Sequence, residues 1–206
     1  MKNSFLIASY STKDTPYEKV MEDYLLDSID KLKEKISYTI SSVPDLGNWH
    51  KNTEFKPKFL LNMLNENKMY DAVVFLDADA RVKKYPKLFE EIPKEYDIAA
   101  HFLDWKTWYG HSNGIMELLS GTLFLRNSNK VKKLVEHWYK KASTGNQWEQ
   151  KALAFVLKFH PEIKVYNLPI EYCYINTLPN GDKPRVKVDS PVIVHYQVSR
   201  ELKRRR

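Results

Sequence analysis

The stretch "DAVVFLDADARV", Asp71–Val82, joins the pattern of a buried strand to a pair of acids. Five apolar residues, 72–76, run directly into Asp77 and Asp79, and no lysine or arginine lies between these two acids. In an extended chain residues i and i+2 point to the same side, so we expect the two carboxylates to converge. Two like charges held that close raise a pKa or splay apart unless a cation joins them.

A divalent cation resolves this conflict, because Mg²⁺ and Mn²⁺ prefer hard oxygen ligands and keep open positions for phosphate oxygens. The alternative is an exposed turn in which Asp77 caps the following segment. The residues alone therefore indicate a metal site or a turn at this strand end.

Strand and helix patterns alternate on the N-terminal side of this stretch. "SFLIASY", residues 4–10, is typical of a buried strand, and a helix pattern with a threonine cap and a proline start covers residues 15–36. A second strand is expected at 37–43 and a second helix at 56–68. This alternation favours an α/β fold, with a mostly parallel sheet covered by helices on both faces.

The C-terminal half continues with less regular spacing. Strands are expected at 96–105, 118–127, 163–169 and 191–199, and helices at 129–142 and 147–160. The least regular part, Asp104–Glu117, is rich in aromatic and polar residues, which is typical of a binding loop.

Composition predicts one folded domain, residues 1–200, followed by a basic tail, residues 201–206. The chain has 206 residues, 43% of them apolar and 13% aromatic, which argues against disorder. Its single cysteine, Cys173, cannot form an internal bridge, and we see no signal peptide or apolar run of membrane-spanning length. We therefore expect a cytoplasmic protein.

The net charge of +7 favours an anionic partner without naming it. Nucleic acid, acidic lipid and a nucleotide diphosphate all qualify. Much of the excess charge lies in "SRELKRRR" at the C-terminus, which a solvated tail or peripheral contact with a membrane would explain.

Several segments resemble one enzyme family. "VVFLDADA" resembles the DxD motif of GT-A-fold glycosyltransferases, whose aspartates hold a divalent ion on the diphosphate of a nucleotide sugar. "WHKNTEFKPKFLLNML" is similar to the segment before that motif in small nucleotide-diphospho-sugar transferases of bacteria, phages and large viruses. "LLSGTLFL", "NQWEQKAL" and "VIVHYQVSR" resemble, in order, a strand lining the donor-sugar pocket, a helix start under the acceptor and the segment of a late metal-binding histidine. The resemblance extends to Arg200 and implies a single-domain GT-A fold, which is Rossmann-like.

The resemblance also implies roles for individual residues. It makes Asp77, Asp79 and His195 the metal ligands and places Ser120 and Gly121 at the donor. A structural histidine is the alternative for His195.

Two carboxylates are candidates for catalysis, Glu149 first and Asp104 second. Either would act as a general base or as a stabiliser of positive charge on the sugar. The sequence departs from the family at two points: no "HxxGxxKPW" pattern follows the late histidine, and Glu149 stands where many relatives have Asp.

Four further residues are candidates for nucleotide binding. Ser199 and Arg200 would hold phosphate oxygens. Lys58 is either a phosphate-binding cation or a solvated helix residue, and Tyr10 either stacks on the base or packs in the core.

The expected function is metal-dependent transfer of a sugar from a nucleotide-diphosphate donor. A UDP-sugar is favoured and a GDP-sugar is second, with Mn²⁺ or Mg²⁺ as the ion and a glycan, a protein or a small molecule as acceptor. Two alternatives stay open: a metal-dependent nucleotidyltransferase, and a basic nucleic-acid-binding protein without catalysis. No GxxxxGK motif occurs and no GxGxxG follows the first strand, which disfavours P-loop and Rossmann dehydrogenase enzymes.

Overall fold

The computed structural model describes residues 3–110, 114–144, 148–178 and 181–204. Residues 111–113 of the expected binding loop, residue 147 of the expected helix 147–160 and residues 205–206 of the expected tail lie outside the described residues.

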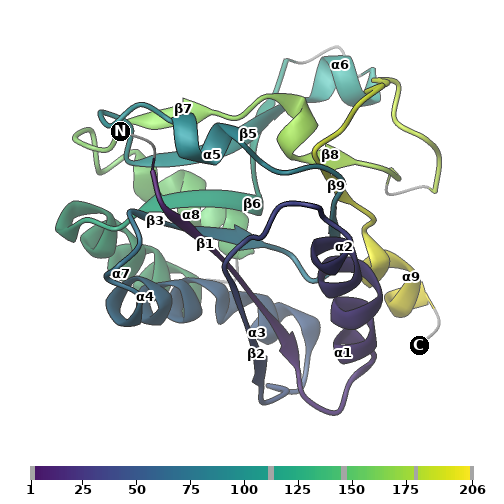
Figure 1. Ribbon diagram of the computed structural model, residues 1–206, viewed down its shortest axis with the longest axis horizontal. Coiled ribbons are helices and arrows are strands. Elements are labelled where there is room, and N and C mark those ends of the chain that lie inside the picture. Colours follow the sequence, from purple (N-terminus) through teal and green to yellow (C-terminus); the bar gives the residue numbers. More distant parts are fainter. Residues whose placement is uncertain (1–2, 111–113, 145–147, 179–180, 205–206) are drawn as a thin grey trace.

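A six-stranded sheet forms the centre of the molecule (Figure 1). In spatial order its strands are β2 (Tyr38–Val43), β1 (Phe5–Thr12), β3 (Ala72–Leu76), β6 (Met116–Arg126), β5 (Ile98–Asp104) and β7 (Val165–Asn167). Only β6 runs antiparallel to its neighbours, β3 and β5, while the other pairs in this sheet are parallel. The predicted mostly parallel sheet is confirmed.

Helices cover both faces of this sheet, as the sequence predicted. One face packs on α4 (Lys56–Glu66), α7 (Asn129–Thr144) and α8 (Glu149–Leu157). The other packs on the segment formed by α1 (Pro16–Val20), a π-helical turn (Met21–Leu26) and α2 (Asp27–Asp30), and on α5 (Leu88–Glu91). Figure 1 shows α4 and α7 at the lower left, apart from α1 and α2 at the right.

The strand β3 connects the two apolar layers. Val73 and Phe75 belong to the cluster with α4, α7 and α8, whereas Val74 and Leu76 belong to the cluster on the opposite face. Because alternate side chains of a strand point to opposite faces, this apolar run is buried on both sides. The end of β3 is thereby fixed in the middle of the sheet.

A small second sheet lies beyond the end of β3. Its strands are β4 (Ala80–Val82), β9 (Ile193–His195) and β8 (Tyr174–Ile175), in the order β4-β9-β8. The antiparallel pairing of β4 and β9 places Ala80 opposite His195. The chain therefore brings a residue near its C-terminus next to the acid pair.

The first helical segment is shorter than predicted. The spacing of apolar residues predicts a helix to Ile36, but the helical segment ends at Asp30. Leu32 and Ile36 still pack against the apolar cluster from the loop that leads to β2. The apolar spacing extends beyond the helix because these two side chains pack in the core although their backbone is not helical.

The described part of the segment Asp104–Glu117 is more regular than predicted. It contains α6 (Trp105–Tyr109) and the first residues of β6. The side chain of Asp104 caps α6 by accepting a hydrogen bond from the backbone N–H of Lys106 at 3.0 Å. Of the remaining helices, α3 (Trp49–Glu54) precedes α4, and a 3₁₀ helix (Ile170–Tyr172) precedes β8. The last helix, α9 (Val198–Arg204), includes the domain boundary predicted at residue 200.

Candidate active site

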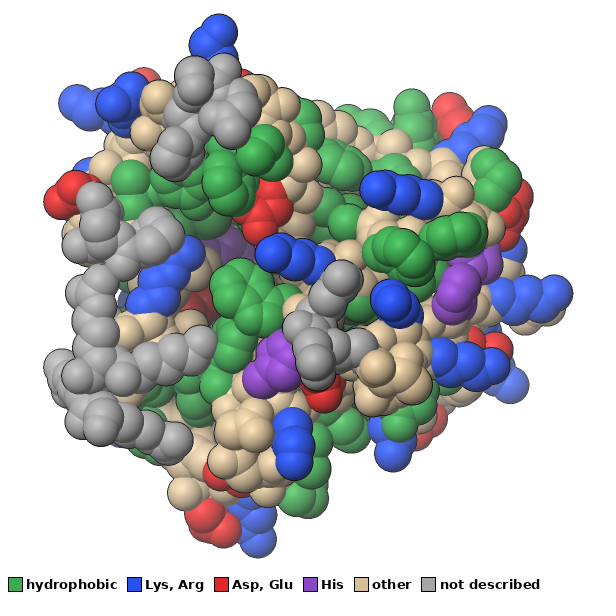
Figure 2. Space-filling model, turned by 180° about the vertical axis from the view of Figure 1, so that it is seen from behind, with side chains coloured by type: hydrophobic (Ala, Val, Ile, Leu, Met, Phe, Trp, Pro, Cys, Tyr) green, Lys and Arg blue, Asp and Glu red, His purple; other side chains and the backbone are tan. Residues whose placement is uncertain are grey.

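A cavity of about 250 Å³ opens beyond the carboxyl end of β3, where ligands bind in open α/β sheets. The space-filling view shows the hollowed face, bordered by hydrophobic side chains (Figure 2). The cavity brings together most of the predicted site residues: Tyr10, Asp77, Asp79, Ser120, Gly121, Glu149, His195, Ser199 and Arg200. Lys58 and Asp104 are not in its lining.

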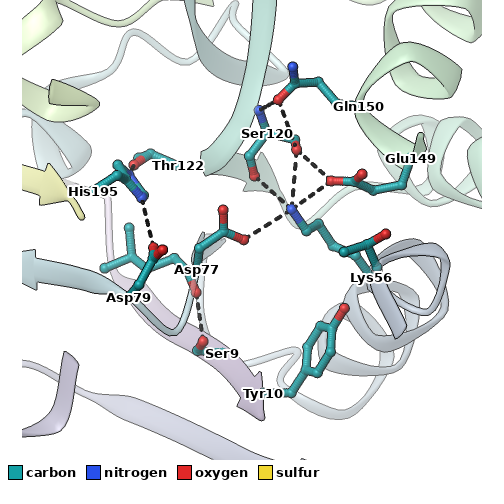
Figure 3. Close-up of polar contacts among 12 residues, drawn as sticks. Ser9, Tyr10, Lys56, Asp77, Asp79, Ser120, Thr122, Glu149, Gln150 and His195 are labelled. Atoms are coloured by element: carbon teal, nitrogen blue, oxygen red, sulfur yellow. Dashed lines mark hydrogen bonds and ion pairs between the residues drawn. The ribbon is translucent and has the colours of Figure 1, made fainter. Parts of the chain in front are cut away.

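Two aspartates and a histidine converge in this cavity. One ligand atom each from Asp77, Asp79 and His195 lies within 4.8 Å of the others. Asp79 Oδ1 is 3.9 Å from His195 Nδ1, and the close-up shows these two side chains facing each other, with the carboxylate of Asp77 beside them and directed at Lys56 (Figure 3). The backbone N–H of Asp77 donates to the carbonyl of Gly121 at 2.9 Å, which ties the end of β3 to β6.

Among the residues that the structure describes, one nitrogen of the buried imidazole of His195 makes no hydrogen bond. Its Nε2 lies 2.8 Å from Thr122 Oγ1, whereas Nδ1 has no hydrogen-bond partner among the described residues, and the residue is only 1% exposed. Burial lowers the pKa of His195, but Cys173 and the two aspartates outweigh it and raise this pKa to about 10. An ion bound at Nδ1 would displace the proton that this raised pKa keeps on the imidazole, and Nε2–H would then donate to Thr122 Oγ1.

Gly121 makes the convergence of these side chains possible. A Cβ atom at this position would lie 2.9 Å from Asp77 Oδ2 and 3.0 Å from His195 Cε1. Carbon atoms do not come this close to a carboxylate and an imidazole without displacing them. The oxygen and nitrogen donors, the unsatisfied Nδ1 and the space kept free by glycine together fit a divalent cation.

Asp79 also connects the acid pair to the C-terminal segment. Its Oδ2 accepts a hydrogen bond from the backbone N–H of Val198 at 2.9 Å, at the start of α9. Ser199 and Arg200 follow in the cavity lining, and Arg200 Nη1 donates to the carbonyl of Thr177 at 2.9 Å. The position of α9 therefore depends on the same carboxylate that faces His195.

Lys56, which sequence reasoning missed, lies at the centre of the polar network (Figure 3). Its Nζ is 3.1 Å from Asp77 Oδ1, 2.8 Å from Glu149 Oε1 and 3.1 Å from Ser120 Oγ, with 3% of the residue exposed. Burial lowers the pKa of Lys56, but the negative charges of Asp77 and Glu149 more than compensate and raise it. Lys56 therefore stays charged.

The helical spacing of α4 distinguishes Lys56 from Lys58. Lys56 falls on the same face as the buried residues Phe59, Leu60 and Met63, whereas Lys58 is exposed. The i, i+3, i+4 pattern was thus the signal that could have identified the buried lysine.

Glu149 is the carboxylate that reaches the cavity from α8. Its Oε1 accepts hydrogen bonds from Lys56 and from Ser120 Oγ, the latter at 2.7 Å. Burial raises the pKa of Glu149, but the charge of Lys56 and the hydrogen bonds lower it by a larger amount. The pKa of Glu149 is therefore lower than its usual value. Gln150, the next residue, accepts the N–H of Ser120 at 2.9 Å and donates to Glu117 at 2.8 Å.

Asp104 and Tyr10 occupy different surroundings. Asp104 hydrogen-bonds within α6, to Thr107 and to Lys106, and lies outside the cavity lining. The ring of Tyr10 lines the cavity and packs against Phe59 at a centroid distance of 5.1 Å, with its hydroxyl bonded to the carbonyl of Asn52 at 2.8 Å.

The fold is that of known glycosyltransferases. A glycosyltransferase involved in the glycosylation of the major capsid of PBCV-1 superposes with a TM-score of 0.65 at 15% identity, covering 97% of this chain and 98% of that one. Mouse xyloside xylosyltransferase 1 gives a TM-score of 0.62 at 12% identity, covering 95% and 98%. GlyE of Streptococcus pneumoniae gives 0.58 at 15% identity, covering 94% of this chain and 54% of that one.

These likenesses show that the chain has the GT-A fold. A family model described as nucleotide-diphospho-sugar transferase matches residues 28–206, and the chain belongs to this family. No curated protein matched the chain. Family membership confirms the prediction that the protein is a glycosyltransferase. It favours this class over the alternative of a nucleic-acid-binding protein without catalysis. Among the described residues, no helix is long and apolar enough to cross a membrane.

Proposed function

We propose that the protein transfers a sugar from a nucleotide-diphosphate donor in a metal-dependent reaction, with a UDP-sugar as the favoured donor and a GDP-sugar as the second. The observation that carries this proposal is the convergence of Asp77, Asp79 and His195 within 4.8 Å around an unsatisfied imidazole nitrogen. These three residues would hold Mn²⁺ or Mg²⁺. When bound, the ion supplies electrostatic stabilisation for the negative charge that develops on the departing diphosphate.

The C-terminal segment contributes the phosphate contacts in this proposal. Ser199 and Arg200 line the cavity beside the acid pair. A guanidinium group binds phosphate oxygens in a bidentate manner, and a hydroxyl adds a single hydrogen bond. The two side chains would therefore orient the diphosphate and stabilise its charge as the bond to the sugar breaks.

Glu149 is the carboxylate proposed to act on the sugar, because Asp104 lies outside the cavity lining. Lys56 and Ser120 both donate to Glu149 Oε1 and keep it ionised and fixed in place. A carboxylate whose pKa is lowered is a weak base but a good partner for positive charge. We therefore assign Glu149 to the stabilisation of the oxocarbenium-like centre rather than to deprotonation of the acceptor.

A thermal-shift panel tests this proposal. UDP, GDP, CDP and ADP are each added with and without Mn²⁺ to the intact protein and to Asp79→Ala. Asp30→Ala, which removes an exposed acid outside the cavity lining, is the matched control. A ligand at a hundred times its dissociation constant adds about 2.7 kcal/mol, a rise in Tm of roughly 5 to 10 °C at this size.

The proposal predicts a metal-dependent shift with UDP, or with GDP as the second donor base, that Asp30→Ala keeps and Asp79→Ala loses. If no nucleotide shifts Tm in the presence of Mn²⁺, or if Asp79→Ala responds like the intact protein, the proposed function is wrong.

A further inference from the structure

Two tryptophans in the cavity lining have no role in the metal cluster or in the Lys56 network. Trp148 exposes 49% of its surface, whereas Trp108 and Trp138 are buried. Trp49, the second tryptophan of the lining, is partly buried. A large aromatic side chain stabilises a fold when it is buried in the core. One that stays exposed beside a cleft therefore indicates a binding surface.

The two tryptophan rings form a corner. Their centroids are 6.0 Å apart and their planes meet at 84°, an edge-to-face contact. Trp49 is the first residue of α3, whose start is fixed by the side-chain cap of Asn48. Trp148 directly precedes α8, and Lys151 Nζ lies 5.6 Å from the centroid of its ring. Two helix starts therefore hold the corner in place.

Polar groups of the same cavity lie next to this corner in the chain. Trp148 is followed by Glu149, which reaches down to Lys56, and by Gln150, which is hydrogen-bonded to Glu117. The side chains of these five residues, from Lys56 to Gln150, all line the cavity. The exposed tryptophan thus belongs to the cavity mouth, while the next residue belongs to its floor.

This combination matches the chemistry of a sugar ring. A pyranose has a face of C–H groups, which carry partial positive charge and suit the negative face of an aromatic ring, and a rim of hydroxyl groups, which suit amide and carboxylate side chains. The donor sugar, tied to its diphosphate, would occupy the floor near Glu149 and the metal cluster. The mouth is therefore the place for the second substrate.

We propose that Trp49 and Trp148 form an acceptor subsite that binds a pyranose through its C–H face, so that the acceptor is a glycan rather than a protein side chain. This inference rests on the proposed function, because it takes Glu149 as the place where the donor sugar reacts.

Ligand-observed saturation-transfer NMR tests the acceptor subsite directly. The probes are methyl pyranosides of the gluco, galacto, manno, xylo, fuco and rhamno series, each titrated with Mg²⁺ and with UDP or GDP. The variants are Trp148→Ala, Trp49→Ala and the conservative Trp148→Phe. Phe159→Ala is the matched control, because Phe159 is 60% exposed and lies outside the cavity lining.

We expect at least one methyl pyranoside to bind, with saturation strongest on the C–H protons of one ring face. Its dissociation constant should rise roughly five- to tenfold in both alanine variants and less in Trp148→Phe, and stay unchanged in Phe159→Ala. Absence of saturation for every pyranoside, or equal affinity in Trp148→Ala and the intact protein, would overturn the inference.

Thermal shifts with nucleotide and Mg²⁺, recorded on the same samples, separate this inference from the proposed function. If nucleotide stabilises the protein but no pyranoside binds, the acceptor subsite is wrong and the proposed function stands. If a pyranoside binds at the tryptophans but no nucleotide stabilises the protein, the acceptor subsite stands and the proposed function is wrong.

Discussion

Gly121 shows how one residue without a side chain can determine a metal site. Asp77 directly follows β3 and His195 ends β9, far apart in the sequence, and they meet over the position where any other residue would place a Cβ atom. The donor atoms belong to the two larger residues, but their distance from each other depends on the glycine.

Gly121→Ala should therefore weaken Mn²⁺ binding about 10- to 100-fold, as changes around metal ligands do. Isothermal titration of the nucleotide-bound protein with Mn²⁺ measures this. Gly114→Ala is the control, because a Cβ atom at Gly114 would meet nothing within 4 Å. Unchanged Mn²⁺ affinity in Gly121→Ala would show that the cluster does not need this close approach.

Lys56 supports a second prediction at the same scale. Lys56→Met keeps the length of the side chain and removes the charge, which leaves the buried Glu149 carboxylate without its ion pair. Breaking a buried pair in this way costs about 3 to 5 kcal/mol of unfolding free energy. Lys58→Met changes an exposed residue of the same helix and should stay within about 0.5 kcal/mol.

Urea denaturation of both lysine variants measures this difference. Similar unfolding free energies for Lys56→Met and Lys58→Met would contradict the buried ion pair. The comparison is matched, because the two lysines lie in the first turn of α4 and differ in the face that they occupy.

At the scale of elements, the pairing of β4 with β9 and the contact between Asp79 and α9 assemble the site from distant parts of the chain. The pairing places His195 beside the acid pair, and Val198 then donates its N–H to Asp79. Ser199 and Arg200 follow directly in the cavity lining. The C-terminal segment thus joins the metal cluster to the residues proposed to bind phosphate.

Truncation before Ser199 should lower nucleotide affinity about tenfold or more, because hydrogen bonds to charged groups contribute about 1.5 to 3 kcal/mol. Mn²⁺ binding should change less, since Val198 and its contact with Asp79 remain. Truncation before Arg205 removes two arginines and keeps α9, so it controls for part of the lost positive charge. Calorimetric titration with UDP and GDP that gives equal affinities for both truncations would contradict the role of Ser199 and Arg200.

At the scale of the whole molecule, local patterns predicted the sheet well and long-range contacts poorly. The apolar run of β3 and the alternation before it predicted a mostly parallel α/β sheet, which is confirmed. The helix predicted to reach Ile36 ended early, because apolar spacing reports burial and not backbone conformation. The pairing of β4 with β9 joins residues more than a hundred positions apart. No local sequence pattern predicts such a pairing.

The candidate site shows the same division. Asp77 and Asp79 could be predicted because an apolar strand ending in two acids is a local feature. Lys56 was missed because its importance depends on Glu149, which lies 93 positions away. In the sequence, Asp104 is an acid in an irregular stretch. Its role as the N-cap of α6 could not be predicted because the helix itself was not predicted.

Product analysis with intact donors tests the central claim most directly. The protein is incubated with UDP-sugars and GDP-sugars, with Mn²⁺ or with chelator, and the released nucleotides are separated by chromatography. We predict Mn²⁺-dependent release of the nucleoside diphosphate from one class of donor, abolished in Asp79→Ala and kept in Asp30→Ala. Release of sugar 1-phosphate, which transfer of the nucleotidyl group from the same donors would give, or equal release of nucleoside diphosphate with chelator would contradict metal-dependent sugar transfer.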